Sequence, residues 1–188
     1  MIKIYSFLFL VLSFSATAQI VSERERAIIV DDILEDRFNT LLPKLMDRSD
    51  IDMWILISRE YNEDPVLKTM LPATWLNARR RTMLVFYRDK ANNTIEKLAI
   101  ARYNVGKSIT SAWDKEKEPD QWKALTKIIA ERNPKKIALN YSDYFGLADG
   151  IVRTDYNEFI EALSPEYVSR IVSAVSYTHL TLPTILLV

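Results

Sequence analysis

The alternation of apolar and polar stretches along the chain predicts short strands separated by amphipathic helices. Residues 51–58 hold an apolar run between Asp52 and Ser58 that is too short for a helix. Such a run is typical of a strand that is buried on both faces, with helices packed above and below it. We therefore expect residues 51–58 to form the core strand of an α/β domain. The polar loop that follows lies at the end of the strand where such sheets usually carry their functional residues.

A long amphipathic helix is predicted before this strand. Ser22 and Glu25 have the spacing of a capping box, in which each side chain accepts a hydrogen bond from the backbone N–H of the other residue. Pro43 should kink or restart the helix, because it lacks an N–H and its ring crowds the preceding turn. The apolar stripe consists of Val30, Leu34, Phe38, Leu41 and Leu45, with Ile33 and Leu42 beside them.

Strands and helices alternate through the rest of the chain. Residues 83–87 and 97–101 are apolar and flank a stretch rich in turn formers, which predicts a β-hairpin beside the core strand. Beyond it we expect, in order, a helix over 119–132, a strand over 137–141, a helix capped by Thr154 and an edge strand over 167–172. This order predicts an α/β fold with a layered mixed sheet and flanking helices.

The connection over residues 59–81 is long, and connections of this length usually have a function or carry structure of their own. It contains Trp75 and the consecutive Arg79, Arg80 and Arg81, whose guanidinium groups suit a clamp for a substrate carboxylate or a neighbouring subunit. The simpler alternative is that these arginines are solvated or paired within the chain. The nearby acidic residues are Glu60, Glu63 and Asp64.

Composition narrows the classes of function. A chain of 188 residues that is 48% hydrophobic can bury one sizeable core, so we expect a single domain over residues 19–175. Lys plus Arg and Asp plus Glu are balanced at 25 each, which disfavours nucleic acid and anionic membranes as partners. There is no Cys, and the single His is His179. Disulfides, thiolate metal sites and a Cys nucleophile are therefore excluded.

Two apparent chemical motifs favour ordinary structural explanations. The first is an acidic group that can be interpreted as a metal cluster, although a solvated helix face explains it better because no His joins it. Its members are Asp31, Asp32, Glu35 and Asp36. The second is the pair Gly146 and Gly150, which lacks the Lys-Ser/Thr ending of a phosphate-binding loop and is typical of a turn.

Both ends of the chain differ in character from the rest. Residues 1–18 combine Lys3, an apolar run and an A-x-A site, which predicts a cleaved signal peptide and an exported protein, periplasmic or secreted. The alternative is a membrane anchor, but the run is shorter than the ~20 residues of a span. Residues 176–188 contain no charged residue and resemble translated adapter sequence, so we expect a non-native read-through tail. A genuine apolar strand or docking segment is the alternative.

The chain resembles the N-terminal domain of creatinase/prolidase-type metallopeptidases, specifically exported Xaa-Pro aminopeptidase relatives. The resemblance covers residues 25–174 as an overall pattern, without a catalytic motif. The stretches most similar to that family are residues 51–60, 61–65, 79–82 and 135–140. It implies a ribonuclease-H-like α/β fold and a following "pita-bread" domain, in which two Asp, two Glu and one His hold two divalent metal ions, Mn, Zn or Co.

That catalytic domain is missing from the sequence, so the resemblance assigns no catalytic, cofactor-binding or metal-binding residue here. It implies a non-catalytic domain that shapes substrate access and subunit contacts, and that acts on short proline-containing peptides only as part of the full enzyme. The expected partners are the catalytic domain and a second copy of the chain. The candidate contact residues are Trp75, Arg79, Arg80 and Arg81.

Two other functions remain as alternatives. The chain is a free-standing secreted interaction or binding module without enzymatic activity if no catalytic domain follows it. A ribonuclease-H-like nuclease is less consistent with the residues, because that chemistry needs carboxylates on the central strands to hold two metal ions. Residues 53–58, 83–87 and 137–140 carry none.

Overall fold

Strand β1 (Met53–Arg59) lies inside a six-stranded mixed sheet of order β4-β3-β2-β1-β5-β6. The computed structural model describes residues 21–174, so the predicted signal peptide and the predicted tail lie outside the described residues. The other strands are β2 (Arg81–Asp89), β3 (Thr94–Ala99), β4 (Thr110–Ser111), β5 (Ile137–Leu139) and β6 (Ile171–Ser173). The β2–β3 hairpin is antiparallel and β1 pairs with β5 in parallel, which confirms the predicted mixed sheet.

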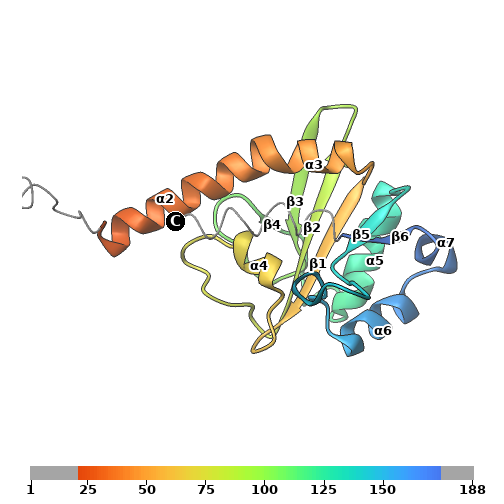
Figure 1. The fold of residues 1–188 in the computed structure, drawn as a ribbon. Coiled ribbons are helices and arrows are strands. Elements are labelled where there is room, and N and C mark those ends of the chain that lie inside the picture. The colour runs from red at the N-terminus through yellow and green to blue at the C-terminus, as the bar shows by residue number, and fades with distance from the viewer. Residues whose placement is uncertain (1–20, 175–188) are drawn as a thin grey trace, which may run out of the picture.

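Helices cover both faces of this sheet, which confirms the layered α/β prediction (Figure 1). Trp54 and Leu56 of β1 point into the core beneath α3 and α4, whereas Met53, Ile55 and Ile57 point into the core beneath α5 and α6. The helices are α2 (Glu23–Asp36), α3 (Leu42–Arg48), α4 (Pro65–Thr69), α5 (Gln121–Arg132), α6 (Arg153–Ala162) and α7 (Pro165–Val168). A 3₁₀ turn spans Gly146–Ala148.

The first helix restarts at Pro43, as predicted. Ser22 and Glu25 form the expected capping box. A π-helical segment, Arg37–Leu41, separates α2 from α3, and the Leu42 N–H donates to the Arg37 carbonyl across it. The segment accommodates Pro43, which has no N–H to offer the preceding turn. Leu34, Phe38 and Leu45 of the predicted stripe are buried, whereas Ile33 remains 38% exposed.

Part of the connection between β1 and β2 belongs to the core. Its residues Val66, Leu67 and Met70 are fully buried in and just after α4, beneath the same face of the sheet as α3. These apolar residues fill the interior beneath the sheet. The connection therefore carries structure of its own, as its length led us to expect.

The predicted cap of α6 is wrong. Helix α6 begins at Arg153 after an extended Val152, which provides no side-chain hydrogen bond, and Thr154 lies within the first turn. This register places Asp155 in the interior, where it meets arginines of β1 and β2. That long-range ion pairing decides the start of the helix over the local preference of Thr154 for a cap.

A buried carboxylate joins α4 to the sheet. Asp64 Oδ1 accepts from the Val66 N–H at 2.7 Å and so caps α4, while Oδ2 accepts from Asn140 Nδ2 at 2.7 Å. The Asn140 side chain in turn accepts from Trp54 Nε1 at 2.9 Å. Burial raises the pKa of Asp64 to about 6, despite the hydrogen bonds that favour its charged form.

This pKa predicts a fall in stability with rising pH. Since the pKa of Asp64 is raised from 3.8 to about 6, the folded state binds more protons than the unfolded state between these values. The free energy of unfolding should therefore fall by at most about 3 kcal/mol between about pH 4 and pH 6. Urea unfolding of the wild type and Asp64→Asn across this range should show this slope only in the wild type. Parallel pH profiles for the two proteins would contradict the assignment.

Gly150 lies directly against Asp64. A Cβ at this position would lie 2.1 Å from Asp64 Cγ, whereas a Cβ at Gly146 would meet nothing within 4 Å. Gly150→Ala should therefore lower the free energy of unfolding by about 2 kcal/mol through overpacking. Gly146→Ala, in the same loop, should leave it nearly unchanged. Thermal or urea unfolding checks both, and equal losses for the two variants would refute the steric explanation.

Candidate functional site

The sequence-predicted arginines lie together in one surface hollow of about 470 Å³. We call it the cationic hollow, because every charged residue that lines it is a cation. These cations are Arg79, Arg80, Arg81, Arg102 and Lys115. The predicted Trp75 forms part of the wall, together with Tyr103 and Trp113. The hollow therefore combines two segments of the chain, one that leads into β2 and one that follows β3.

A left-handed residue gathers the three consecutive arginines. Arg80 has φ 54°, and its N–H donates to the Glu60 carboxylate at 3.0 Å. The Arg79 N–H donates to Thr82 Oγ1 at 2.9 Å. In a regular strand, successive side chains point to opposite faces of the sheet. The turn at Arg80 interrupts this alternation, so Arg79, Arg80 and Arg81 all line the same hollow.

The indole of Trp75 supports Arg79. The guanidinium carbon of Arg79 lies 4.5 Å from the centroid of the Trp75 ring. A guanidinium that stacks on an indole is stabilised by the ring quadrupole and keeps its N–H edges available for a ligand. Arg79 is thereby positioned as a donor in the hollow.

Arg81 is held instead by a group that we call the Asp155 cluster, formed by Arg59, Arg81, Asp155 and Glu158. Arg59 Nε and Nη2 donate to the two carboxylate oxygens of Asp155 at 2.9 and 2.8 Å. Arg81 Nε lies 3.4 Å from Asp155 Oδ1, and its Nη2 lies 3.3 Å from Glu158 Oε2. Asp155 is fully buried, and its hydrogen bonds raise the pKa of Arg59. Arg81 also stacks on Trp122 at 4.5 Å.

The arginines thus have different roles, and the simpler alternative, pairing within the chain, holds for Arg81. Arg81 is paired within the chain, but with Asp155 and Glu158 rather than with the acidic residues of its own connection. Among residues 21–174, no carboxylate forms an ion pair with Arg79 or Arg80. The same holds for Arg102 and Lys115 within the described part of the chain. The charges of these four side chains are therefore not neutralised by an ion pair within residues 21–174.

Sequence reasoning missed Arg102, Tyr103, Trp113 and Lys115. Arg102 and Tyr103 directly follow the predicted second strand of the hairpin, so they emerge at the end of the sheet where β2 begins. Hairpin register was therefore the available signal for these two residues. Trp113 and Lys115 belong to an irregular segment, where no periodicity indicates which side chains face the hollow.

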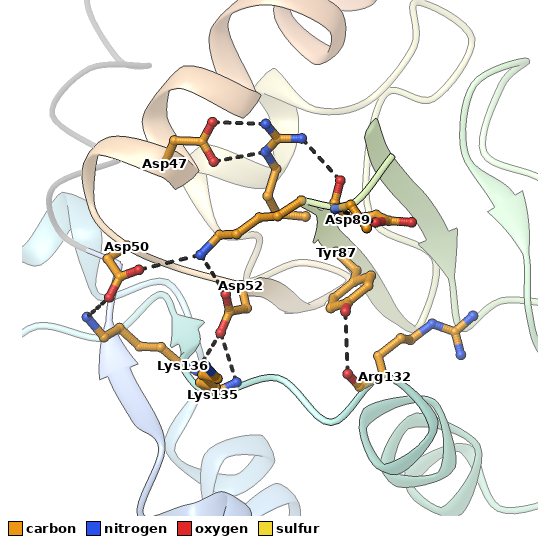
Figure 2. A network of polar contacts seen from close by, with 11 residues as sticks. Asp47, Asp50, Asp52, Tyr87, Asp89, Arg132, Lys135 and Lys136 are labelled. Carbon is orange, nitrogen blue, oxygen red and sulfur yellow. Dashed lines mark hydrogen bonds and ion pairs between the residues drawn. The ribbon is translucent and has the colours of Figure 1, made fainter. Parts of the chain in front are cut away.

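A second polar group, which contains both cations and carboxylates, lies at the opposite end of β1 (Figure 2). Asp52 Oδ1 accepts from Lys90 Nζ at 3.0 Å, and Asp52 Oδ2 accepts from the Lys135 N–H at 2.9 Å. Asp47 accepts two hydrogen bonds from Arg88, which lower the pKa of Asp47. These contacts tie β1 to the β2–β3 turn and to the start of β5.

Other candidate chemistry has little structural support. Within residues 21–174, no group of three or more His, Cys, Asp or Glu is placed to hold a metal ion. Asp31, from the acidic group of α2, accepts a hydrogen bond from the Ala73 N–H at 2.8 Å. None of the helices between residues 21 and 174 has the length and apolarity that a membrane span requires.

Comparisons with known proteins give only a distant likeness. No protein-family model matches the chain, and no curated protein shows significant similarity to it. Among solved structures, the chain is similar to a Xaa-Pro dipeptidase from Bacillus anthracis with a TM-score of 0.43 and 12% sequence identity. The alignment covers 79% of this chain and 33% of the dipeptidase. A likeness this weak does not assign a function.

The Asp155 cluster predicts unequal effects within the arginine triplet. Arg81→Ala removes ion pairs to Asp155 and Glu158 and the stack on Trp122, so it should lower the free energy of unfolding by about 2 kcal/mol. Arg80→Ala keeps the backbone contacts of that residue and removes an exposed side chain, so its effect should stay within about 0.5 kcal/mol. Urea unfolding compares the two, and equal losses would contradict the division of roles.

Proposed function

We propose that this chain is the non-catalytic N-terminal domain of an exported Xaa-Pro aminopeptidase-like metallopeptidase, where it shapes substrate access and subunit contacts. The observation that carries the proposal is the assembly of Trp75 and Arg79–81 in one hollow with Arg102 and Lys115, where only Arg81 forms an ion pair within residues 21–174. The resemblance of residues 25–174 to the N-terminal domains of creatinase/prolidase-type enzymes supports the same role. The α/β architecture is compatible with it.

In this proposal, the residues of the hollow position the substrate or the neighbouring subunit. Arg79 presents its guanidinium from the face of Trp75, and Arg81 is anchored by Asp155 and Glu158. Arg102 approaches from the other segment. Such groups would bind a carboxylate of a short peptide or of a neighbouring subunit and would exclude longer substrates.

The peptide-bond chemistry belongs to a second domain in this proposal. A divalent metal pair there, Mn, Zn or Co, would activate the water that attacks the bond before proline. Residues 21–174 offer no ligand set for such a pair, so no catalytic step is assigned to this chain.

The source DNA provides the decisive test. Sequencing across and beyond the codons for residues 174–188 should reveal an open frame that continues into a domain with two Asp, two Glu and one His as ligands. The protein encoded by that frame should hydrolyse short Xaa-Pro peptides when divalent metal is added. A stop codon after Val188 would refute the peptidase proposal and favour the free-standing secreted binding module.

The same full-length protein tests the role of the hollow. Arg79→Gln combined with Arg102→Gln should raise KM for a short Xaa-Pro peptide about tenfold with little change in kcat, because these residues would bind substrate without reaching the metal. Arg24→Gln is the matched control, since Arg24 is an exposed arginine of α2 outside the hollow. Unchanged kinetics in the double variant would remove the proposed role in substrate access.

A further inference from the structure

We propose that the cationic hollow is a binding site for an acidic peptide segment that presents two or more carboxylates. This inference deepens the proposed function by naming the kind of ligand that the hollow binds. It rests on that function only for where the ligand comes from, a substrate peptide or a neighbouring subunit. The binding itself requires only the residues of this chain.

Charge is the first argument for an anionic ligand. The chain has no net charge, yet every charged residue that lines the hollow is a cation. Among residues 21–174, Arg79, Arg80, Arg102 and Lys115 form no ion pair with a carboxylate. Like charges that converge in a hollow repel one another, and an anion between them removes this repulsion. In contrast, Arg88, Lys90 and Lys136 at the other end of β1 form ion pairs with carboxylates of the chain itself.

The two-sided construction of the hollow favours more than one carboxylate. Arg79 and Arg80 come from the segment before β2, whereas Arg102 and Lys115 come from the segments after β3. Each pair can contact a separate carboxylate. Arginine can do so through two parallel N–H···O bonds, which adds geometric selectivity.

Aromatic side chains provide fixed walls between these cations. Trp113 Nε1 donates to the Glu118 carbonyl at 2.7 Å, and Trp75 lies against Arg79. Both indoles are therefore held in place before a ligand arrives, which reduces the conformational entropy lost on binding. They offer apolar contact to the backbone and the methylene groups of a peptide.

The same features disfavour nucleic acid and other extended polyanions. Such ligands are bound by cations spread along a groove, and affinity arises from many phosphate contacts. Here the four cations without an ion pair among residues 21–174 lie around one hollow of about 470 Å³. The formal net charge of the chain is zero. A short acidic segment fits this distribution of charge better.

Fluorescence polarisation with a labelled tetraglutamate peptide tests the inference on this chain. The peptide should bind, and binding should weaken as salt is raised, because exposed charges are screened. Arg79→Gln combined with Arg102→Gln should weaken it at least tenfold, whereas Arg24→Gln should change it less than about twofold. A labelled tetraglutamine peptide, equal in length but uncharged, should not bind.

Any of three results would overturn the inference: tetraglutamine binds as well as tetraglutamate, the double variant keeps its affinity, or pyrophosphate or a thymidine oligonucleotide binds more tightly than the peptide. Wild-type NMR gives a readout that does not depend on how the variants fold. The indole N–H signals of Trp75 and Trp113 should shift on addition of tetraglutamate, and unmoved signals would also refute the site. This assay uses the chain as it stands, so its failure is distinct from failure to find a downstream catalytic domain.

Discussion

The buried carboxylate of Asp155 is the constraint on which the arrangement of the sheet and its helices depends. Arg59 and Arg81 are directly opposite partners in the β1–β2 register, and like charges in that position destabilise strand pairing. Asp155 of α6 lies within ion-pair distance of both and neutralises the repulsion. Burying Asp155 without these partners would be strongly unfavourable. The register of the two central strands and the position of α6 therefore stabilise each other.

This constraint also explains why the cationic hollow lies at one end of the sheet. Arg81 belongs to both structures, because its guanidinium is fixed by the Asp155 cluster while the residue lines the hollow. At the other end of β1, Lys90 pairs with both Asp50 and Asp52, and Lys136 pairs with Asp50 (Figure 2). One end of the sheet thus pairs several of its charges within the chain, whereas at the other end Arg79, Arg80, Arg102 and Lys115 form no ion pair with a carboxylate of residues 21–174.

Local patterns predicted much of the fold, but little of the site. The two-sided burial of β1, the Ser22 capping box and the restart at Pro43 each depend on neighbouring residues, so periodicity and spacing were enough. The prediction that Thr154 caps α6 was wrong because Asp155 pairs with arginines that are distant in sequence. The triplet of arginines marked the position of the site, whereas Arg102 and Lys115 joined it only through strand register and an irregular segment. Side-chain partners across such distances leave no periodic signal.

The two edges of the sheet have a consequence for self-association. An edge strand presents unpaired N–H and C=O groups that can pair with a strand of another molecule, and long edges promote aggregation. Here the apolar central strands β1 and β2 are enclosed on one side by β3 and the two-residue β4, and on the other by β5 and the three-residue β6. Such short outer strands offer few backbone groups for intermolecular pairing. Within residues 21–174, the outermost strands β4 and β6 therefore add little backbone for such pairing beside a centre rich in β-branched and aromatic residues.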